Sequence, residues 1–438
     1  LIPESVLISN TKGIDDAILA LLVLEKKCRT TNDTHTLKQL CLHMVRLCRE
    51  KNDWIKLNST VAVINKRRNQ SKFAVTAVVE ECLTYIEQTP TKAVKIDLIS
   101  ALKDICEGKM YLEAESARLH LMLALIFEAD GDIAAACEII QDVHVETYGS
   151  LSKKEKAEYI LQQVRLNLLR KDFVRALIHS RKMNKRTLED PDEDFDDVKI
   201  FFYRLMVQYH LHDFNYWEIC QCYYKIYDTE TTKSDPIAMS DALNNCISFL
   251  LLSKHNNAQN DMLERISVLK NALKSCPEFI TVVTLMKNME IIPSDFPMKD
   301  RMVLDSSDTV PITSSDGDTN AHHKSLCETS LTNRVIEHNI RVLSRYYTDV
   351  RTARAAEMLG LSVDELENGA VVLEDEVTGN GGTSLYIRIN RPDGIVSFSA
   401  PKTAEATLSD WSNDITGLFS LMETTCHLIN RENMVYKV

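Results

Sequence analysis

The chain has 438 residues, of which 45% are hydrophobic and 26% charged, and its formal net charge is -12. This composition is typical of a soluble globular protein and excludes a largely disordered chain. The length predicts two or three domains. The negative charge disfavours non-specific binding to nucleic acid or to an anionic membrane surface.

The first residues, LIPESVLISN, lack the basic start and apolar centre of a signal peptide. The apolar run at residues 17–24 is too short to span a bilayer. The 12 cysteines are scattered through helical patterns without CxxC pairs, so we expect reduced, mostly buried thiols. These features predict a protein of the cytoplasm and nucleus with no membrane partner.

Apolar residues recur with helical spacing from residue 14 to about 290. The stretch ESARLHLMLALIFEADGDIAAACEIIQDV gives the unit: a helix, an Asp-Gly turn, and a second helix led by Asp132. One side of its first helix carries Leu119, Met122, Leu123 and Ile126. A hairpin of this kind cannot bury both of its apolar faces alone, so neighbouring copies are expected to stack on it.

A short phrase, a polar turn followed by Asp and a large apolar residue that opens a helix, recurs along this region. It stands at Asp53-Trp54, Asp132-Ile133, Asp172-Phe173 and Asp213-Phe214. The separations are multiples of about 40 residues, the repeat length of helical-hairpin solenoids. One copy has lost the phrase, near EGKMYLEAE. The sequence predicts a TPR- or HEAT-like α-solenoid over residues 1–290, with an irregular helical bundle as the alternative.

Two charged segments interrupt this region. The acidic residues 188–199, LEDPDEDFDDVK, are predicted to form a solvated loop between helices. NKRRNQSK, residues 65–72, is the one basic cluster, and we interpret it as a solvated turn at a helix end. From residue 291 to 333 the composition shifts to Pro, Ser, Asp and Thr, which predicts a mobile linker.

Residues 334–400 have the pattern of a winged helix. A helical stripe of Val335, Ile336, Ile340 and Leu343 comes first, and a short helix over 351–359 ends at Gly360. A capping box at Ser362 starts a third helix that contains no Lys or Arg as far as Glu376. Leu385, Ile387 and Ile389 then alternate before a Pro-Asp-Gly turn and Ile395, which predicts a β-hairpin wing.

The last segment, residues 405–438, is predicted to be a long amphipathic helix that starts at Ser409. Its apolar stripe consists of Trp411, Ile415, Leu418, Phe419, Met422 and Ile429. A stripe of this length requires a partner surface.

Candidate chemistry is weak throughout the chain. His210, His212, Cys220 and Cys222 resemble zinc ligands in type, but helical residues two apart point to different faces. His210 and His212 also form an HxH, which begins the motif of a JAMM-type metalloprotease. The Ser and Asp that follow in that motif are absent, because Cys220 and Tyr223 occupy their positions. The glycine-rich residues 378–384 lack the Lys of a P-loop. We therefore expect no catalytic residue, no metal and no cofactor, and a protein that is not an enzyme.

The layout of solenoid, winged helix and terminal helix resembles the PCI family, scaffold subunits of the proteasome lid, the COP9 signalosome and translation initiation factor three. NRVIEHNIRVLSRYY, LSVDELE, DGIVSF and LSDWSNDITGLFSLMETTCHLI look like a PCI subunit of the proteasome regulatory particle lid. LLVLEKKCRT, NKRRNQSK and VETYGSLSKKEKAEYIL extend this resemblance over nearly the whole chain. EIIPSDFPM and DEVTGNGGTSLY depart from the pattern.

The resemblance implies a non-catalytic scaffold in the degradation of ubiquitinated proteins. Its implied partners are other PCI subunits of the lid, the lid deubiquitinating metalloprotease and its inactive partner, with the ATPase ring or the core particle as further candidates. The implied docking residues of the winged helix are Asp364, Glu365, Ile387, Ile389, Ile395 and Phe398. Two alternatives stay open, a PCI subunit of the COP9 signalosome and a winged-helix nucleic-acid binder, although the acidic third helix opposes a phosphate backbone.

Overall fold

The computed structural model describes residues 14–31, 33–184, 186, 188, 195–269, 277–292, 317–360, 362–364, 366, 387–399 and 403–435. Two units make up the chain, one ending at Ala242 and the other beginning at Leu243, within helix α14 (Pro236–Leu252). Helices dominate both units, and the described strands lie near the C-terminal end, which confirms the predicted mainly α fold.

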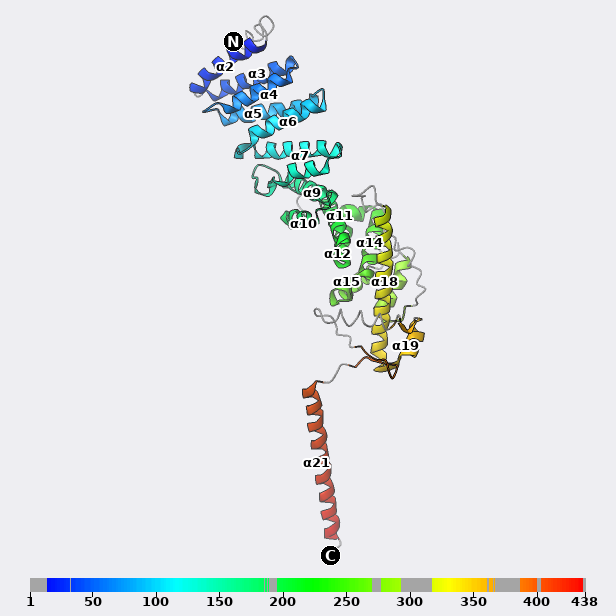
Figure 1. Ribbon diagram of the computed structural model, residues 1–438. Coiled ribbons are helices and arrows are strands. Elements are labelled where there is room, and N and C mark those ends of the chain that lie inside the picture. The colour runs from blue at the N-terminus through cyan, green and yellow to red at the C-terminus, as the bar shows by residue number, and fades with distance from the viewer. Residues whose placement is uncertain are drawn as a thin grey trace. The chain divides into compact units, whose positions relative to one another are not determined.

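The first unit is a stack of helix pairs, coloured from blue to green in Figure 1. Its helices are α2 (Ile14–Thr30), α3 (Thr34–Glu50), α4 (Trp54–Lys66), α5 (Lys72–Tyr85), α6 (Lys92–Cys106), α7 (Glu113–Ala129), α8 (Ile133–Gln141), α9 (Lys153–Leu169), α10 (Phe173–Lys182), α11 (Asp196–His212), α12 (Tyr216–Tyr227) and α13 (Glu230–Ser234). Short 3-10 turns η1 (Ile86–Gln88), η2 (Met110–Leu112) and η3 (Val145–Thr147) join some of them. Helix α3 packs on α4 and α5, and α9 packs on α10 and α11, so each pair buries its faces against the next, as in a solenoid.

One turn geometry recurs between the helices of a pair. The residue before the capping position has a left-handed backbone, with φ of 55° at Asn52, 86° at Gly131, 65° at Lys171 and 51° at Phe214. The next backbone N–H then donates to the carbonyl five residues earlier, the longer bond of a Schellman turn. These bonds are Asp53 to Cys48, Asp132 to Phe127, Asp172 to Asn167 and Asn215 to His210.

The structure confirms that three of the four Asp phrases open a helix, and it shows that each Asp is the N-terminal cap. The Asp53, Asp132 and Asp172 side chains each accept a bond from the backbone N–H three residues on, at 3.1–3.2 Å. The fourth prediction is wrong. Asp213 is the C-terminal cap of α11, and Asn215 is the N-terminal cap of α12, because α11 continues to His212 and moves the turn two residues along.

Several smaller predictions are settled in the first unit. A turn with Gly108 at φ 72° and η2 replaces the lost phrase near EGKMYLEAE. Met122 is 38% exposed, so it does not belong to the buried side of α7 with Leu119 and Leu123. Helix α11 begins at Asp196, inside the segment predicted to be a loop, and residues 189–194 of that segment lie outside the described residues. Among the described cysteines none forms a disulfide bond, and of these only Cys426 is exposed.

The second unit contains α15 (Asn257–Val268), α17 (Pro277–Asn288) and the long α18 (Gly317–Tyr346). The predicted linker is wrong for residues 317–333, which form the first half of α18. In this polar segment, Cys327 and Leu331 are buried one helical turn apart. They continue the apolar stripe that starts at Val335, a signal that the polar composition made easy to overlook. The rest of the predicted linker, residues 293–316, lies outside the described residues.

The winged helix follows α18. Strand β1 (Asp349–Arg351), helix α19 (Thr352–Leu359) and strands β2 (Arg388–Asn390) and β3 (Ile395–Ser397) form it, with strand order β1-β3-β2 and antiparallel pairing. The hairpin wing and the left-handed Gly360 that ends α19, at φ 65°, are confirmed. Strand β1 was not predicted. Of the acidic third helix, the structure describes Ser362, Val363, Asp364 and Leu366, and the remaining residues to Glu376 lie outside it.

The C-terminal helix is longer than predicted. Helix α21 runs over Ala404–Val435, 32 residues, and Figure 1 draws it in red as one uninterrupted helix. Thr403 caps it, because its hydroxyl oxygen accepts a bond from the Ala406 N–H at 3.2 Å. The predicted start at Ser409 is therefore wrong, since Ser409 lies in the second turn.

Candidate protein-interaction surfaces

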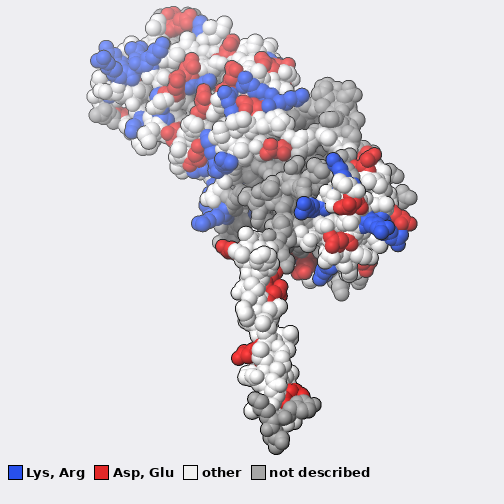
Figure 2. Space-filling model, turned by 60° about the horizontal axis from the view of Figure 1, so that its bottom comes forward, with Lys and Arg blue, Asp and Glu red and all other residues white. Residues whose placement is uncertain are grey.

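Helix α21 presents an apolar surface without a described partner. Every residue of the helix is exposed, and the side chains of the predicted stripe are between 53% and 70% exposed. These side chains are Trp411, Ile415, Leu418, Phe419, Met422 and Ile429. Figure 2 shows this helix as a mostly uncharged surface with a few acidic residues, whereas Lys and Arg gather in patches on the first unit. A monomer rarely exposes so large a contiguous apolar surface unless it is an interaction site.

The spacing of the stripe defines what can cover it. Large side chains alternate three and four residues apart from Leu408 through Trp411, Ile415, Leu418 and Met422, and the series resumes at Ile429. This is the a/d pattern of a coiled coil, interrupted at Thr425, which occupies a d position. A strict seven-residue repeat favours packing against other long helices rather than against a globular surface.

The sheet of the winged helix has one face in its own core and one toward solvent. Strand register places Val350, Val396 and Ile389 side by side on the inner face. On the outer face, the half-buried Ile395 lies between Arg351 and Asn390. In the next outer row, Ser397 lies between Asp349 and Arg388, both exposed. The outer face is thus one apolar side chain surrounded by charges of both signs.

This arrangement divides the predicted docking residues into those that lie in the core and those that stay accessible. Ile387 is 5% exposed and belongs to the core of the winged helix, so its prediction as a contact residue is wrong. Side chains two apart on a strand share a face, and Ile389 is therefore also directed inward, as is the half-buried Phe398. Ile395 and the exposed Asp364 stay accessible. Glu365 lies outside the described residues. Arg351 and Arg388 were missed because a three-residue strand gives little alternation to recognise.

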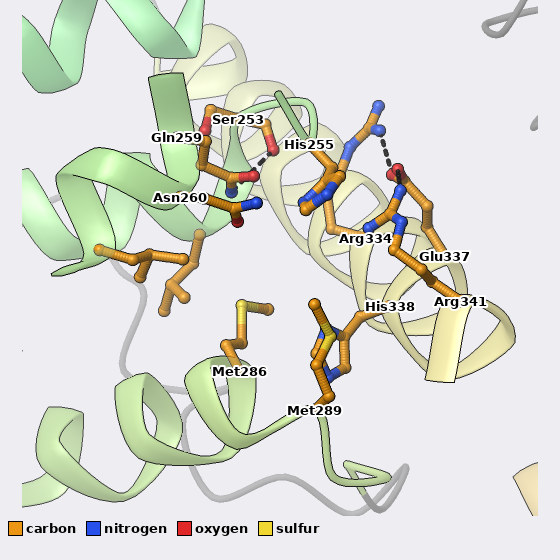
Figure 3. Close-up of a pocket in the computed structure, with 12 residues that line it drawn as sticks. Ser253, His255, Gln259, Asn260, Met286, Met289, Arg334, Glu337, His338 and Arg341 are labelled. Atoms are coloured by element: carbon orange, nitrogen blue, oxygen red, sulfur yellow. Dashed lines mark hydrogen bonds and ion pairs between the residues drawn. The ribbon is translucent and has the colours of Figure 1, made fainter. Parts of the chain in front are cut away.

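A polar cluster on α18 faces the end of α15 and α17 within the second unit (Figure 3). The Glu337 carboxylate lies between two guanidinium groups, with Oε2 accepting from Arg334 at 2.5 Å and Oε1 from Arg341 at 2.6 Å. The Glu337 side chain is 8% exposed, and each arginine side chain is 16% exposed. This cluster was not predicted, although the spacing of i, i+3 and i+7 on one helix face was a usable signal.

The cavity beside this cluster is too small for a metabolite. Its volume is about 30 Å³, which accommodates one or two water molecules. His255, His338, Met286 and Met289 are among the residues that line it. The pKa of His255 is lowered to about 4, first by burial and then by the nearby Arg341 guanidinium. Burial also lowers the pKa of His338, whose Nε2 lies 3.1 Å from the Glu290 carbonyl oxygen.

The zinc-like residues of the sequence are not brought together. His212 stacks on Phe173, with ring centroids 3.6 Å apart, and Cys220 and Cys222 are buried in α12. Among the described residues, no group of three or more His, Cys, Asp or Glu is arranged to hold a metal ion. In the same part of the chain, every helix is too short or too polar to cross a bilayer.

Comparison with known proteins decides the family. The family described as PSMD12/CSN4, N-terminal, matches residues 16–235, the PCI domain matches residues 308–373, and the 26S proteasome regulatory subunit RPN5 C-terminal domain matches residues 406–437. The 26S proteasome non-ATPase regulatory subunit 12 of Dictyostelium discoideum is 36% identical over 97% of this chain and 90% of its own length. The chain belongs to the PSMD12/RPN5 family of PCI proteins.

Two further relatives extend the same comparison. Homolog A of 26S proteasome non-ATPase regulatory subunit 12 from Arabidopsis thaliana is 34% identical over 97% of this chain and 98% of its own length. The 26S proteasome regulatory subunit RPN5 of Saccharomyces cerevisiae is 32% identical over 96% of this chain and 92% of its own length. The RPN5 C-terminal match covers most of α21, so the exposed helix is itself a recognised part of the PSMD12/RPN5 family.

Proposed function

We propose that this chain is a non-catalytic scaffold subunit of the regulatory particle lid of the 26S proteasome, present in the cytoplasm and nucleus. In this proposal α21 joins other long helices, the winged helix docks neighbouring PCI subunits, and the subunit helps to hold the lid deubiquitinating metalloprotease and its inactive partner. The solenoid is then free to reach the ATPase ring or the core particle.

The observation that carries the proposal is the exposed stripe of α21. Burying large apolar side chains contributes about 25 cal/mol per Å² of apolar area, so covering this stripe would supply several kcal/mol of assembly energy. The heptad spacing fits helical partners, and five acidic residues beside a single Arg431 would bias the choice toward partner helices that carry basic flanks. The near full-length likeness to proteasome subunits supports this choice of assembly.

The test is affinity purification of the tagged chain in the presence of ATP. We expect co-purifying lid subunits and ATP-dependent proteasome peptidase activity. The double variant Phe419→Asp/Met422→Asp should lose the lid while its solenoid stays folded. Ser420→Asp/Thr424→Asp adds the same charge on the polar side of the helix and should leave assembly intact. Normal lid incorporation of the stripe variant would refute the role of α21.

The COP9 signalosome is the second candidate, because the family matching residues 16–235 is described for both PSMD12 and CSN4. Deneddylation of cullins by the purified sample, without peptidase activity, would transfer the chain to that assembly. The RPN5 C-terminal match over residues 406–437 favours the proteasome.

A further inference from the structure

One surface of the solenoid is not used by the proposed assembly contacts. The segments 65–73 and 107–111 meet there, at the end of α4, the start of α5 and the turn before α7. The Lys72 ammonium lies 5.8 Å from the centroid of the Tyr111 ring, and the Lys109 ammonium donates a hydrogen bond to the Asn65 side-chain oxygen. We call these two segments the basic corner.

The basic corner is strongly positive in an acidic protein. Its cations are Lys66, Arg67, Arg68, Lys72 and Lys109, and its single acidic side chain is Glu107. Lys66, Arg67 and Arg68 are exposed and form no ion pair with any residue that the structure describes. The uncompensated charge therefore faces solvent, in a chain whose net charge is -12.

Apolar side chains project from the same corner. Phe73 is 75% exposed and Met110 is 82% exposed. They are the chain neighbours of Lys72 and Tyr111, the two residues in the cation–π contact, so both belong to this corner. A single exposed apolar side chain is unremarkable. Aromatic, Met and Arg side chains together are the composition enriched at protein interfaces.

Three contacts hold the basic corner in place, one to its backbone and two to its side chains. The Arg29 guanidinium of α2 donates to the Arg68 carbonyl, and the Gln70 amide of the loop lies 3.7 Å from the Cys41 sulfur of α3. The Lys109 contact to Asn65 fixes the turn before α7 against α4. A purely solvated turn has no need of such anchoring. A preorganised one loses less entropy when a partner binds.

We propose that the basic corner docks an acidic segment of a partner protein, one that carries an aromatic or aliphatic anchor between its carboxylates. The carboxylates would pair with Arg67, Arg68 and Lys72, and the anchor would pack between Phe73 and Met110. A nucleic acid fits less well, because binding to single strands uses several stacking rings along a basic track. Here the Tyr111 ring is already faced by Lys72, which leaves Phe73 as the one open ring.

The test uses the purified chain of 438 residues, so it does not depend on the proposed scaffold role. The probe is a fluorescein-labelled peptide of about 15 residues in which Asp and Glu flank Phe and Leu. A second peptide replaces Phe and Leu with Ser, and a single-stranded RNA of about 15 nucleotides tests the nucleic-acid reading. Anisotropy titrations at about 50 mM and about 300 mM salt separate electrostatic from apolar binding.

Matched variants assign the binding to the basic corner. We call the probe that contains Phe and Leu the apolar peptide. Arg67→Glu/Lys72→Glu and Phe73→Ala/Met110→Ala should each weaken the binding of this peptide by about tenfold or more. Lys26→Glu/Lys27→Glu and Ile55→Ala/Val174→Ala change equally exposed side chains of the same unit and should stay within about twofold of the unmodified chain. Circular dichroism would verify that all four variants fold.

Four results would overturn the proposal: no binding of the apolar peptide, equal binding of the Ser peptide, tighter binding of the RNA, or corner variants that bind like the unmodified chain. A failure here would leave the α21 test of the scaffold role unaffected.

Discussion

Asn339 and Ile292 are joined by two hydrogen bonds that use both polar groups of the amide side chain. The Ile292 N–H donates to Asn339 Oδ1 at 2.9 Å, and Asn339 Nδ2 donates to the Ile292 carbonyl at 2.8 Å. Ile292 is 1% exposed and Asn339 is 4% exposed. The amide thus pairs the chain after α17 with α18 in the way that a neighbouring strand would.

Replacing Asn339 with Ala should destabilise the second unit by about 2–4 kcal/mol, because two buried backbone groups lose their partners. Urea denaturation followed by circular dichroism would measure the change. Asn333→Ala, on an exposed position of the same helix, is the matched control and should change stability by less than about 0.5 kcal/mol. Equal effects of the two substitutions would mean that the Asn339 bonds contribute nothing specific.

Glu337 should be far more sensitive than an exposed acidic residue in a similar pair. Glu337→Ala leaves the guanidinium groups of Arg334 and Arg341, each 16% exposed, without their shared carboxylate. Removing one member of a buried ion cluster costs about 3–5 kcal/mol. The control Glu357→Ala breaks the Arg354–Glu357 pair, in which both side chains are more than half exposed, and should cost less than about 1 kcal/mol. Thermal unfolding of the two variants would compare them directly.

The second unit should lose stability as the pH falls from about 6.5 toward 4. The folded pKa of His255 is lowered to about 4, so the unfolded chain binds more protons in this window and acid favours unfolding. The groups that act on it are Arg341, Glu337, His338 and Gln259. Because His255 is partly exposed, we expect a loss of about 1 kcal/mol at pH 5.

Urea denaturation at pH 7 and pH 5 would measure this loss. His255→Asn should reduce the difference between the two pH values, whereas His35→Asn, at an exposed position on α3, should retain it. An unchanged pH dependence in His255→Asn would assign the effect to other groups.

The repeated turn separates two aspartates that look alike in the sequence. Asp132→Ala removes a cap that accepts from the Ala135 N–H at 3.1 Å and should cost about 1 kcal/mol. Asp213→Ala removes a side chain at a helix C-terminus, where an acidic group opposes the helix dipole, and should be neutral or slightly stabilising. Denaturant titrations of the two variants test the shifted turn.

These turns show what the sequence could and could not predict. Helical spacing and the Asp phrases predicted the solenoid correctly, because both reflect short-range backbone chemistry. The phrase at Asp213 failed because Phe214 adopts the left-handed backbone, which is unusual for a large side chain. The start of α18 failed for another reason. Ser, Thr and Asp predict a linker by composition, but the buried pair Cys327 and Leu331 makes the segment helical through tertiary packing.

The candidate surfaces divide in the same way. The α21 stripe was predictable because nothing in the described chain covers it. The helical spacing of its apolar residues alone therefore determines which side chains form the exposed surface. In the winged helix, the pattern identified apolar strand residues but not which face they occupy, because Ile387 and Ile395 look equivalent in sequence. The strand register decides which of the two faces the core. This register depends on β1, a strand of three residues that lies far from β3 in the sequence and pairs with it.

Ile387 and Ile395 should therefore respond oppositely to the same substitution. Ile387→Asp places a charge in the core beside Val396 and should unfold the winged helix, which would appear as a lowered Tm and loss of assembly together.

Ile395→Asp alters the half-buried centre of the outer sheet face, between Arg351 and Asn390, where a neighbouring Arg can pair with the new carboxylate. Its Tm should stay within a few degrees of the unmodified chain, while its recovery in affinity-purified complexes falls. Ser397→Asp, on the same face but between Asp349 and Arg388, is the control for added charge. If Ile395→Asp enters complexes as well as the unmodified chain, the outer face is not a docking surface, and the partner contacts of this domain must be made by other residues.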